Sequence, residues 1–190
     1  MNAEIDISNV ILKTERLTLR PWRQTDLNDF YAYASVDGVG QMAGWKPHEN
    51  IEESAYRLNK FIAEKRTFAL DLNGKCIGSL GVELYNEERF PEFADKKCRQ
   101  IGFVLSKDYW GQGLMPEAVK AVVEYLFNDV GLDVILCSHY VWNKRSQRVQ
   151  EKCGFKKYAL SKHETKFGTV EDSQENVLTK EVWLSEIREK

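Results

Sequence analysis

The sequence contains little that would indicate an unfolded, fibrous or membrane-spanning chain. Only 4 of its 190 residues are proline, while 43% are hydrophobic and 29% charged, which is close to an ordinary globular domain. The longest unbroken apolar run, Phe30 to Ala34, is five residues, whereas a helix that spans a bilayer needs roughly 20. The composition therefore predicts a folded, single-domain protein without a membrane-spanning helix.

Cysteine and histidine are also scarce. The chain has four cysteines, which form no Cys-x-x-Cys pair, and three widely spaced histidines: Cys76, Cys98, Cys137, Cys153, His48, His139 and His163. This spacing indicates neither a metal site nor a disulfide framework. The opening stretch, 1–13, has no apolar block ending in small residues and so lacks the pattern of a secretory signal. We expect a cytoplasmic protein.

No strong excess of one charge is present. The net charge of −2 argues against a nucleic-acid-binding protein, whose affinity would depend on neutralising phosphates. Within this balance, residues 143–166 carry eight Lys and Arg against two acids, and residues 83–95 carry five acids against Arg89 alone. We therefore expect one basic and one acidic surface patch.

Hydrophobic spacing and turn residues indicate the order of strands and helices. Strands are expected over 11–19, 68–72, 77–84, 98–105, 134–141, 155–159 and 175–183. Helices are expected over 26–34, 51–64, 116–130 and 143–153. Asn73-Gly74, between two of these strands, is typical of a tight hairpin turn. This order predicts an α/β or α+β sheet with helices on its faces.

A loop with two glycines, Gly111 and Gly113, joins an expected strand to the longest expected helix. Free N–H groups at the start of such a helix attract an anion, and glycine lets the backbone approach it. A bare Gly-x-Gly can equally serve only to turn the chain. No Gly-Lys-Ser/Thr follows, which excludes a Walker loop. The other cluster, Gly38-Val39-Gly40, follows a helical segment instead of a strand, so we reject it as a dinucleotide-binding fingerprint.

Several short motifs occur in a fixed order along the chain. They are Arg16-Leu17-Thr18-Leu19-Arg20-Pro21-Trp22, Ile77-Gly78-Ser79-Leu80-Gly81, Ile101-Gly102-Phe103-Val104-Leu105, Trp110-Gly111-Gln112-Gly113-Leu114-Met115-Pro116-Glu117-Ala118, and the set Asn143, Ser146, Lys152, Gly154 and Phe155. In order and spacing they resemble GNAT N-acetyltransferases, and more closely the branch that contains the ribosomal-protein N-terminal acetyltransferases. The resemblance covers about residues 12–158.

This resemblance implies the GNAT fold in one domain over residues 1–190. In that fold a mixed, mostly antiparallel sheet has a central V-shaped splay between two parallel strands, and helices cover both faces. It also implies acetyl-CoA as cofactor, with its pantetheine in the V and its phosphates at the Gly-containing loop. The implied binding residues are Phe103, Val104, Trp110, Gly111, Gln112, Gly113, Leu114, Met115, Asn143 and Ser146. Trp110 and Met115 depart from the family's loop pattern, but phosphate contacts made by backbone should survive.

The reaction implied is attack of an amine on a thioester, which needs a neutral amine, a stabilised oxyanion and a protonated leaving thiolate. By resemblance, Ser146 is the candidate proton donor to sulfur, and a backbone N–H of Val104 or its neighbour is the oxyanion candidate. Asn143 and Ser146 could also serve only as helix-capping residues. Gln100 stands where many relatives have glutamate and cannot accept a proton, which leaves Glu83 or a water relay as the base.

The acceptor is open at this point. A missing strong base favours a peptide or protein N-terminal α-amine, which is more often neutral than a lysine amine. A small-molecule amine such as a polyamine, amino sugar or amino acid is the alternative, and a catalytically silent CoA-binding regulatory protein is the alternative of another class. We expect no nucleic-acid or membrane partner, and either a monomer or a homodimer.

Overall fold

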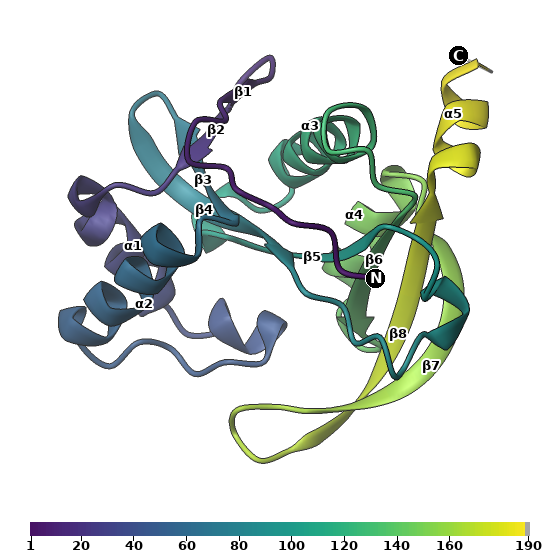
Figure 1. The fold of residues 1–190 in the computed structure, drawn as a ribbon. Helices are drawn as coiled ribbons and strands as arrows, with labels where there is room; N and C mark the ends of the chain where they lie inside the picture. Colours follow the sequence, from purple (N-terminus) through teal and green to yellow (C-terminus); the bar gives the residue numbers. More distant parts are fainter. Residues whose placement is uncertain (189–190) are drawn as a thin grey trace.

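One eight-stranded sheet organises the chain (Figure 1), of which a computed structural model describes residues 1–188. The strands are β1 (Leu12–Lys13), β2 (Thr18–Pro21), β3 (Thr67–Leu72), β4 (Lys75–Glu83), β5 (Cys98–Leu105), β6 (Val134–Tyr140), β7 (Lys156–Glu164) and β8 (Val170–Thr179). The helices are α1 (Leu27–Ala34), α2 (Ile51–Glu64), α3 (Leu114–Asn128), α4 (Lys144–Lys152) and α5 (Lys180–Arg188). Within residues 1–188, no helix combines the length and apolarity needed to cross a membrane.

The sheet is antiparallel except at its centre. The strand order is β1-β2-β3-β4-β5-β6-β8-β7, and β5 and β6 are the parallel pair. Strand β5 pairs with β4 as far as Leu105 but with β6 only as far as Ile101. Beyond Ile101 the two parallel strands therefore diverge, which confirms the predicted V-shaped splay.

Several of the sequence-based boundaries are wrong: β7 extends past the expected 155–159, β8 begins before 175, and α3 spans 114–128 instead of 116–130. The expected single strand over 11–19 is a hairpin, in which Leu12 pairs with Leu19 and the Thr14 hydroxyl bonds the turn at Leu17. The last strand was expected over 175–183, but β8 ends at Thr179, whose hydroxyl accepts a hydrogen bond from Val182 N at 3.3 Å. That bond caps the first turn of α5, so side-chain capping overrides the strand pattern.

Different elements cover the two faces of the sheet. The largest apolar cluster packs α3, through residues such as Val119, Val122 and Phe127, against one face. On the other face, α1 and α2 cover the β3–β4 end, and a loop over 85–97 covers the β6–β8 end through Tyr85 and Phe90. Gly102 of β5 lies on this second face with its surface open, since a Cβ placed there would contact nothing within 4 Å. The centre of the second face is therefore accessible at the point where β5 and β6 diverge.

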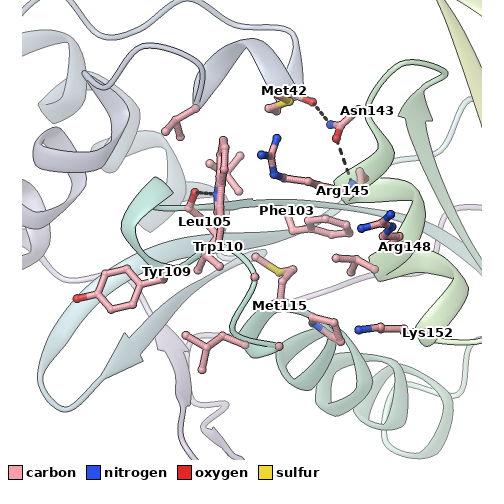
Figure 2. A pocket seen from close by; sticks show the side chains of 18 residues that line it. Met42, Phe103, Leu105, Tyr109, Trp110, Met115, Asn143, Arg145, Arg148 and Lys152 are labelled. Atoms are coloured by element: carbon pink, nitrogen blue, oxygen red, sulfur yellow. Dashed lines mark hydrogen bonds between the residues drawn. The ribbon is translucent and has the colours of Figure 1, made fainter.

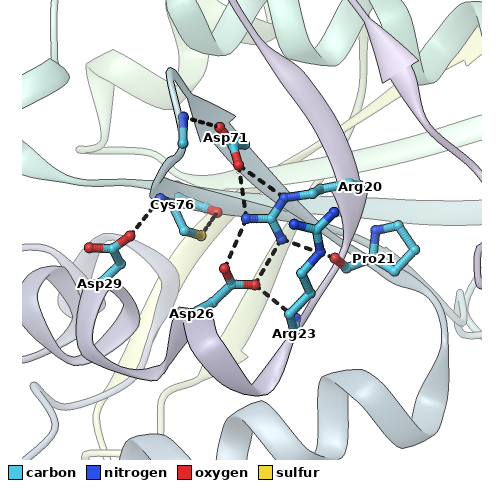
Figure 3. A network of polar contacts seen from close by, with 9 residues as sticks. Arg20, Pro21, Arg23, Asp26, Asp29, Asp71 and Cys76 are labelled. Atoms are coloured by element: carbon cyan, nitrogen blue, oxygen red, sulfur yellow. Dashed lines mark hydrogen bonds and ion pairs between the residues drawn. The ribbon is translucent and has the colours of Figure 1, made fainter.

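A buried arginine joins β2, β3 and the segment before α1 (Figure 3). The Arg20 guanidinium makes two hydrogen bonds of 2.8 Å to Asp26 and further bonds of 2.9 and 3.0 Å to Asp71. The Asp26 carboxylate also accepts Arg23 N, and Asp71 accepts Gly74 N in the hairpin turn. The second arginine of the N-terminal motif is thus a structural residue that ties the first helix to the sheet.

Candidate active site

A cleft of about 350 Å³ lies between β5, the loop that follows it, and α4 (Figure 2). We refer to it as the β5–α4 cleft. Of the cofactor-binding residues inferred from the sequence, all but Gln112 line it. The sequence reasoning missed other lining residues, which are Val39, Met42, Leu105, Tyr109, Pro116, Val149 and Lys152. Most of these are apolar residues of the kind found in any core, so no local signal marks them.

One wall of the cleft is the unpaired edge of β5. Ser106 N donates to Ile77 O at 2.8 Å across the β4–β5 ladder. Because hydrogen bonding alternates along an antiparallel pair, the backbone groups of Val104 also face β4, while those of Phe103 and Leu105 face the splay. The sequence suggested that Phe103 and Val104 line the splay. The backbone groups of Phe103 do face it, but those of Leu105 face it in place of those of Val104. An extended amide-containing chain can bond there as an added strand.

The loop after β5 is fixed to the end of that strand. Trp110 Nε1 donates to Leu105 O at 2.8 Å, which holds the indole over the cleft mouth. Gly111 and Gly113 both have φ of +78°, a conformation that strongly favours glycine. Gly113 is the N-cap of α3 and supplies no side chain to its first amides. The loop thus offers backbone N–H groups and a helix terminus to an anion.

The first arginine of the N-terminal motif supports this loop from behind. Arg16 Nη1 donates to Gln112 O at 2.9 Å, and its guanidinium pairs with Glu117 of α3 at 2.6 Å. Thr14 Oγ1 also donates to Glu117. Although partial burial raises the pKa of Glu117, these hydrogen bonds and the Arg16 charge outweigh it and lower that pKa. The Gln112 side chain turns away and donates to Asp108 O, so this residue holds the loop instead of lining the cleft.

Basic side chains from α4 form the opposite wall. The Arg145 guanidinium lies 4.6 Å from the centre of the Trp110 ring, and Arg148 and Lys152 line the cleft beside it. Lys144, from the same basic run, instead bonds Gln147. The free edge of β5 fits the amide-containing pantetheine of coenzyme A. The exposed loop amides and the basic wall fit its phosphates. The geometry thus agrees with the group that the sequence resemblance implies.

Asn143 and Ser146 begin α4 at the inner end of the cleft. Asn143 Oδ1 accepts Ser146 N at 3.1 Å, which is the capping bond, and Asn143 Nδ2 donates to Met42 O. Gln150, which is 1% exposed, donates to both Ser146 Oγ and Ser138 O at 3.1 Å. Asn176 Nδ2 donates to Gln150 Oε1 at 2.6 Å and so fixes the orientation of that amide. Ser146 Oγ therefore accepts a bond from Gln150, which leaves its own proton for the cleft.

A second cavity, of about 390 Å³, opens on the opposite face of β5. We refer to it as the β4–α2 cavity. It is lined by Phe30, Trp45, Lys46, His48, Glu53, Arg57, Phe61, Ser79, Val104 and Lys166. Val104 lines both this cavity and the β5–α4 cleft, so the two spaces meet at the splay. Sequence reasoning placed only Val104 of these residues in the site, because the others come from two helices, β4, an irregular segment and a hairpin turn that share no motif.

His48 is a nearly buried residue of the β4–α2 cavity, with 6% of its surface exposed. Its Nδ1 lies 2.7 Å from Ser54 Oγ, and its ring packs against Phe30 and Trp45. Its Nε2 has no hydrogen-bond partner within residues 1–188. Burial lowers the pKa of His48; Glu53 opposes this effect, and Arg57 and Lys166 add to it. The imidazole is therefore neutral near pH 7, and in the tautomer in which Nδ1 donates to Ser54 Oγ its Nε2 can accept a proton.

Glu83 lies apart from the other predicted residues and lines neither space. It pairs with Gln100 across β4 and β5, and Arg66 Nε lies 3.2 Å from its carboxylate. Burial raises the pKa of Glu83 despite the Arg66 charge. Its carboxylate leans along the sheet, since a Cβ on Gly81 would come within 2.6 Å of Glu83 Oε1. Between the Glu83 carboxylate and the splay, the surface of the sheet is formed by Gly81 and Gly102, which have no side chains.

Comparisons with known proteins agree with this geometry. A family model described as an acetyltransferase (GNAT) domain matches residues 16–156. YoaA of Bacillus subtilis, an uncharacterised N-acetyltransferase, is 30% identical over 155 residues, which are 77% of this chain and 83% of YoaA.

Two solved structures illustrate the similarity in fold. The microcin C7 self-immunity acetyltransferase MccE, in complex with acetyl-CoA and AMP, has a TM-score of 0.73 at 15% identity, over 87% of this chain and 93% of that one. The ribosomal-protein-S5-alanine acetyltransferase of Vibrio fischeri has a TM-score of 0.70 at 20% identity, over 92% and 99%. At such identities these two likenesses concern the fold alone. The family model, however, covers most of the chain, and this protein accordingly belongs to the GNAT family of acetyl-CoA-dependent N-acetyltransferases.

Proposed function

We propose that this protein transfers the acetyl group of acetyl-CoA to an α-amine, foremost that of a peptide or protein N-terminus. The observation that carries the proposal is the meeting of two spaces at Val104, a basic cleft on one face of the sheet and a separate cavity on the other. A donor in the first and an amine in the second would meet through the gap between β5 and β6. A protein acceptor is also that of the ribosomal-protein-S5-alanine acetyltransferase with a similar fold, although that likeness itself concerns the fold alone.

Acetyl-CoA would supply an acetyl thioester, and this chain's residues would do the rest. The backbone N–H groups of Phe103 and Leu105 face the splay, where they can hold pantetheine and stabilise negative charge on a carbonyl oxygen. Ser146 can donate its proton to the leaving sulfur, because Gln150 already bonds the other side of its hydroxyl, and solvent would return a proton to the hydroxyl afterwards. Asn143 holds the first turn of α4 in place.

The proton of the amine can leave by two routes. His48 lines the β4–α2 cavity with a free Nε2, so we propose it as the nearer base, acting directly or through water. Glu83, which the sequence left as a candidate base beside a water relay, would act only through water over the Gly81–Gly102 surface. A base with a lowered pKa suits an α-amine, whose pKa is near 8, better than a lysine amine near 10.4.

A small-molecule amine is the second candidate acceptor. The β4–α2 cavity measures about 390 Å³ and has the aromatic residues Phe30, Trp45 and Phe61 in its lining. This volume lies within the range of about 300–1,000 Å³ that is usual for small-ligand pockets. The cavity can therefore hold either the first residues of a peptide or a compact amine.

A thiol reagent that detects released CoA tests the proposal over a panel of amines. The native protein should contribute little background, because its four cysteines are buried and burial raises the pKa of each thiol. We expect turnover with short peptides that have a free N-terminus and far less with the same peptides blocked at the terminus and carrying only lysine. Mass spectrometry should locate the acetyl group on the α-amine.

Three outcomes would contradict the assignment in different ways. Predominant ε-acetylation would exclude α-amine selectivity, and turnover confined to small amines would select the second candidate. Tight acetyl-CoA binding without turnover on any amine would instead indicate a catalytically silent CoA-binding protein.

A further inference from the structure

The β4–α2 cavity contains more positive than negative charge. Lys46, Arg57 and Lys166 are in its lining, against the single acid Glu53, within the part of the chain that the structure describes. Among residues 1–188, no carboxylate lies within ion-pair distance of any of these three cations. His48 carries no negative charge in either protonation state, and its lowered pKa keeps it neutral. The lining therefore has an uncompensated excess of positive charge.

Two distant segments bring these cations together. Arg57 projects from α2, and Lys166 lies in the turn between β7 and β8. This turn is braced, since Lys166 N donates to Gly44 O at 3.0 Å and Thr165 N donates to Thr169 O at 2.8 Å. Partial desolvation lowers the pKa of Lys166, and the charges of Arg57 and Lys60 lower it further, against the opposing effect of Glu53. The fold thus holds like charges near one another at a cost that a bound anion would relieve.

We propose that the β4–α2 cavity selects acceptors in which the amine is accompanied by a carboxylate or phosphate group. This inference rests on the proposed function, and it names the acceptor class for the same site. Arg57 and Lys166 bind the anionic group, and the aromatic residues of the lining pack against the carbon chain of the acceptor. The amine then extends toward Val104 and His48. The acidic segment 83–95 has no residue in the lining, so it does not set this preference.

Matched tripeptide amides with a free α-amine test the inference. Their second residue is Asp, phosphoserine, Asn or Lys, so that only its charge and the source of the anion change. We expect the wild-type kcat/KM to be at least about tenfold higher for the Asp and phosphoserine peptides than for the Asn peptide, and lowest for Lys. A gain for phosphoserine alone would assign the subsite to phosphate, and a gain for Asp alone would assign it to carboxylate.

Variants of the cavity then locate the effect. Arg57→Gln combined with Lys166→Gln should bring kcat/KM for the Asp peptide to within about threefold of that for the Asn peptide. Lys75→Gln is the control, because Lys75 is an exposed cation at the start of β4 and lies outside the lining. It should keep the full preference.

A binding measurement keeps this test separate from the proposed function. Calorimetry with CoA present and the N-acetylated Asp and Asn peptides as probes reports the anion preference without turnover. Equal binding and equal kcat/KM of the Asp and Asn peptides would overturn the inference even for an active enzyme. A preference that survives in the double variant would overturn the assignment to Arg57 and Lys166. Absent turnover with preserved Asp selectivity in binding would overturn only the proposed function.

Discussion

At the scale of single residues, the hydroxyl of Ser146 illustrates how a proton can be directed. Gln150 has both amide hydrogens engaged, one by Ser146 Oγ and one by Ser138 O, and Asn176 holds the amide in that orientation. A hydroxyl that accepts on one side donates on the other. The same side chain at the start of a helix could otherwise satisfy only the local backbone.

Ser146→Ala should therefore lower kcat by roughly 10- to 100-fold, because the sulfur must leave without a proton donor. The dissociation constant of acetyl-CoA, measured by calorimetry, should change little. Ser185→Ala on α5 is a remote serine control. A wild-type kcat in Ser146→Ala would leave Ser146 as a helix-capping residue only.

The acid side of the pH profile tests His48. A base works only when unprotonated, and burial lowers the pKa of His48, so kcat at saturating acceptor should hold until the pH falls below about 6.5 and then decline. His48→Gln should reduce kcat by roughly 10- to 100-fold and remove that decline. His163→Gln, which alters an exposed histidine outside the cavity lining, is the control. Loss of the decline in Glu83→Gln instead would identify Glu83 as the base.

At the scale of elements, the loop between β5 and α3 combines two requirements in one residue. Gly113 has φ of +78°, and its position as N-cap of α3 keeps the anion-facing amides bare. A side chain there would strain the backbone, and a carboxylate would also repel phosphate.

Gly113→Asp should abolish acetyl-CoA binding in calorimetry while the protein remains folded, and Gly113→Ala should weaken binding far less. Gly131→Asp is a matched control, because Gly131 follows the other end of α3, has φ of +74° and has open space where a Cβ would lie. Acetyl-CoA binding within a factor of three of wild type in Gly113→Asp would exclude this loop from the site.

The elements also show what sequence can and cannot predict. The Asn73-Gly74 hairpin, β5 and the buried face of α3 were predictable, because local turn chemistry and regular apolar spacing determine them. The break at Thr14 and the start of α5 at Thr179 were not, because each depends on a hydroxyl bond within a pattern that otherwise continues a strand. The β4–α2 cavity was also missed, because only tertiary packing brings Lys166 near α2.

At the scale of the whole molecule, the hydrogen bonds of Arg20 to Asp26 and Asp71 connect the segment before α1 to the sheet (Figure 3). The side chains of Arg20 and Asp26 are 5% and 6% exposed, and that of Asp71 is 15% exposed. Removing the cation would leave two carboxylates near each other whose remaining partners are the backbone amides of Arg23 and Gly74.

Arg20→Ala should lower the free energy of unfolding by about 3–5 kcal/mol, because breaking a buried ion pair leaves an uncompensated charge. Urea denaturation measures this value. Arg23→Ala is the control, since it removes an equal charge from an exposed side chain and should cost less than about 0.5 kcal/mol. Equal midpoints for the two variants would mean that the network contributes nothing to stability.

The unpaired edge of β5 should affect how fast its backbone amide hydrogens exchange with deuterium from heavy water. The amides of Phe103 and Leu105 face the splay beside strand pairs that are fully bonded on the β4 side. Without ligand, they should take up deuterium quickly although they belong to the centre of the sheet. Saturating CoA should slow their uptake by at least tenfold, while a peptide from β4 shows no change, and unchanged uptake at residues 101–106 would exclude strand-like pairing of the ligand. The centre of this sheet is then no better protected from exchange than an edge strand until a ligand pairs with it, so in the free protein the sheet would open from its middle as well as from its outer strands.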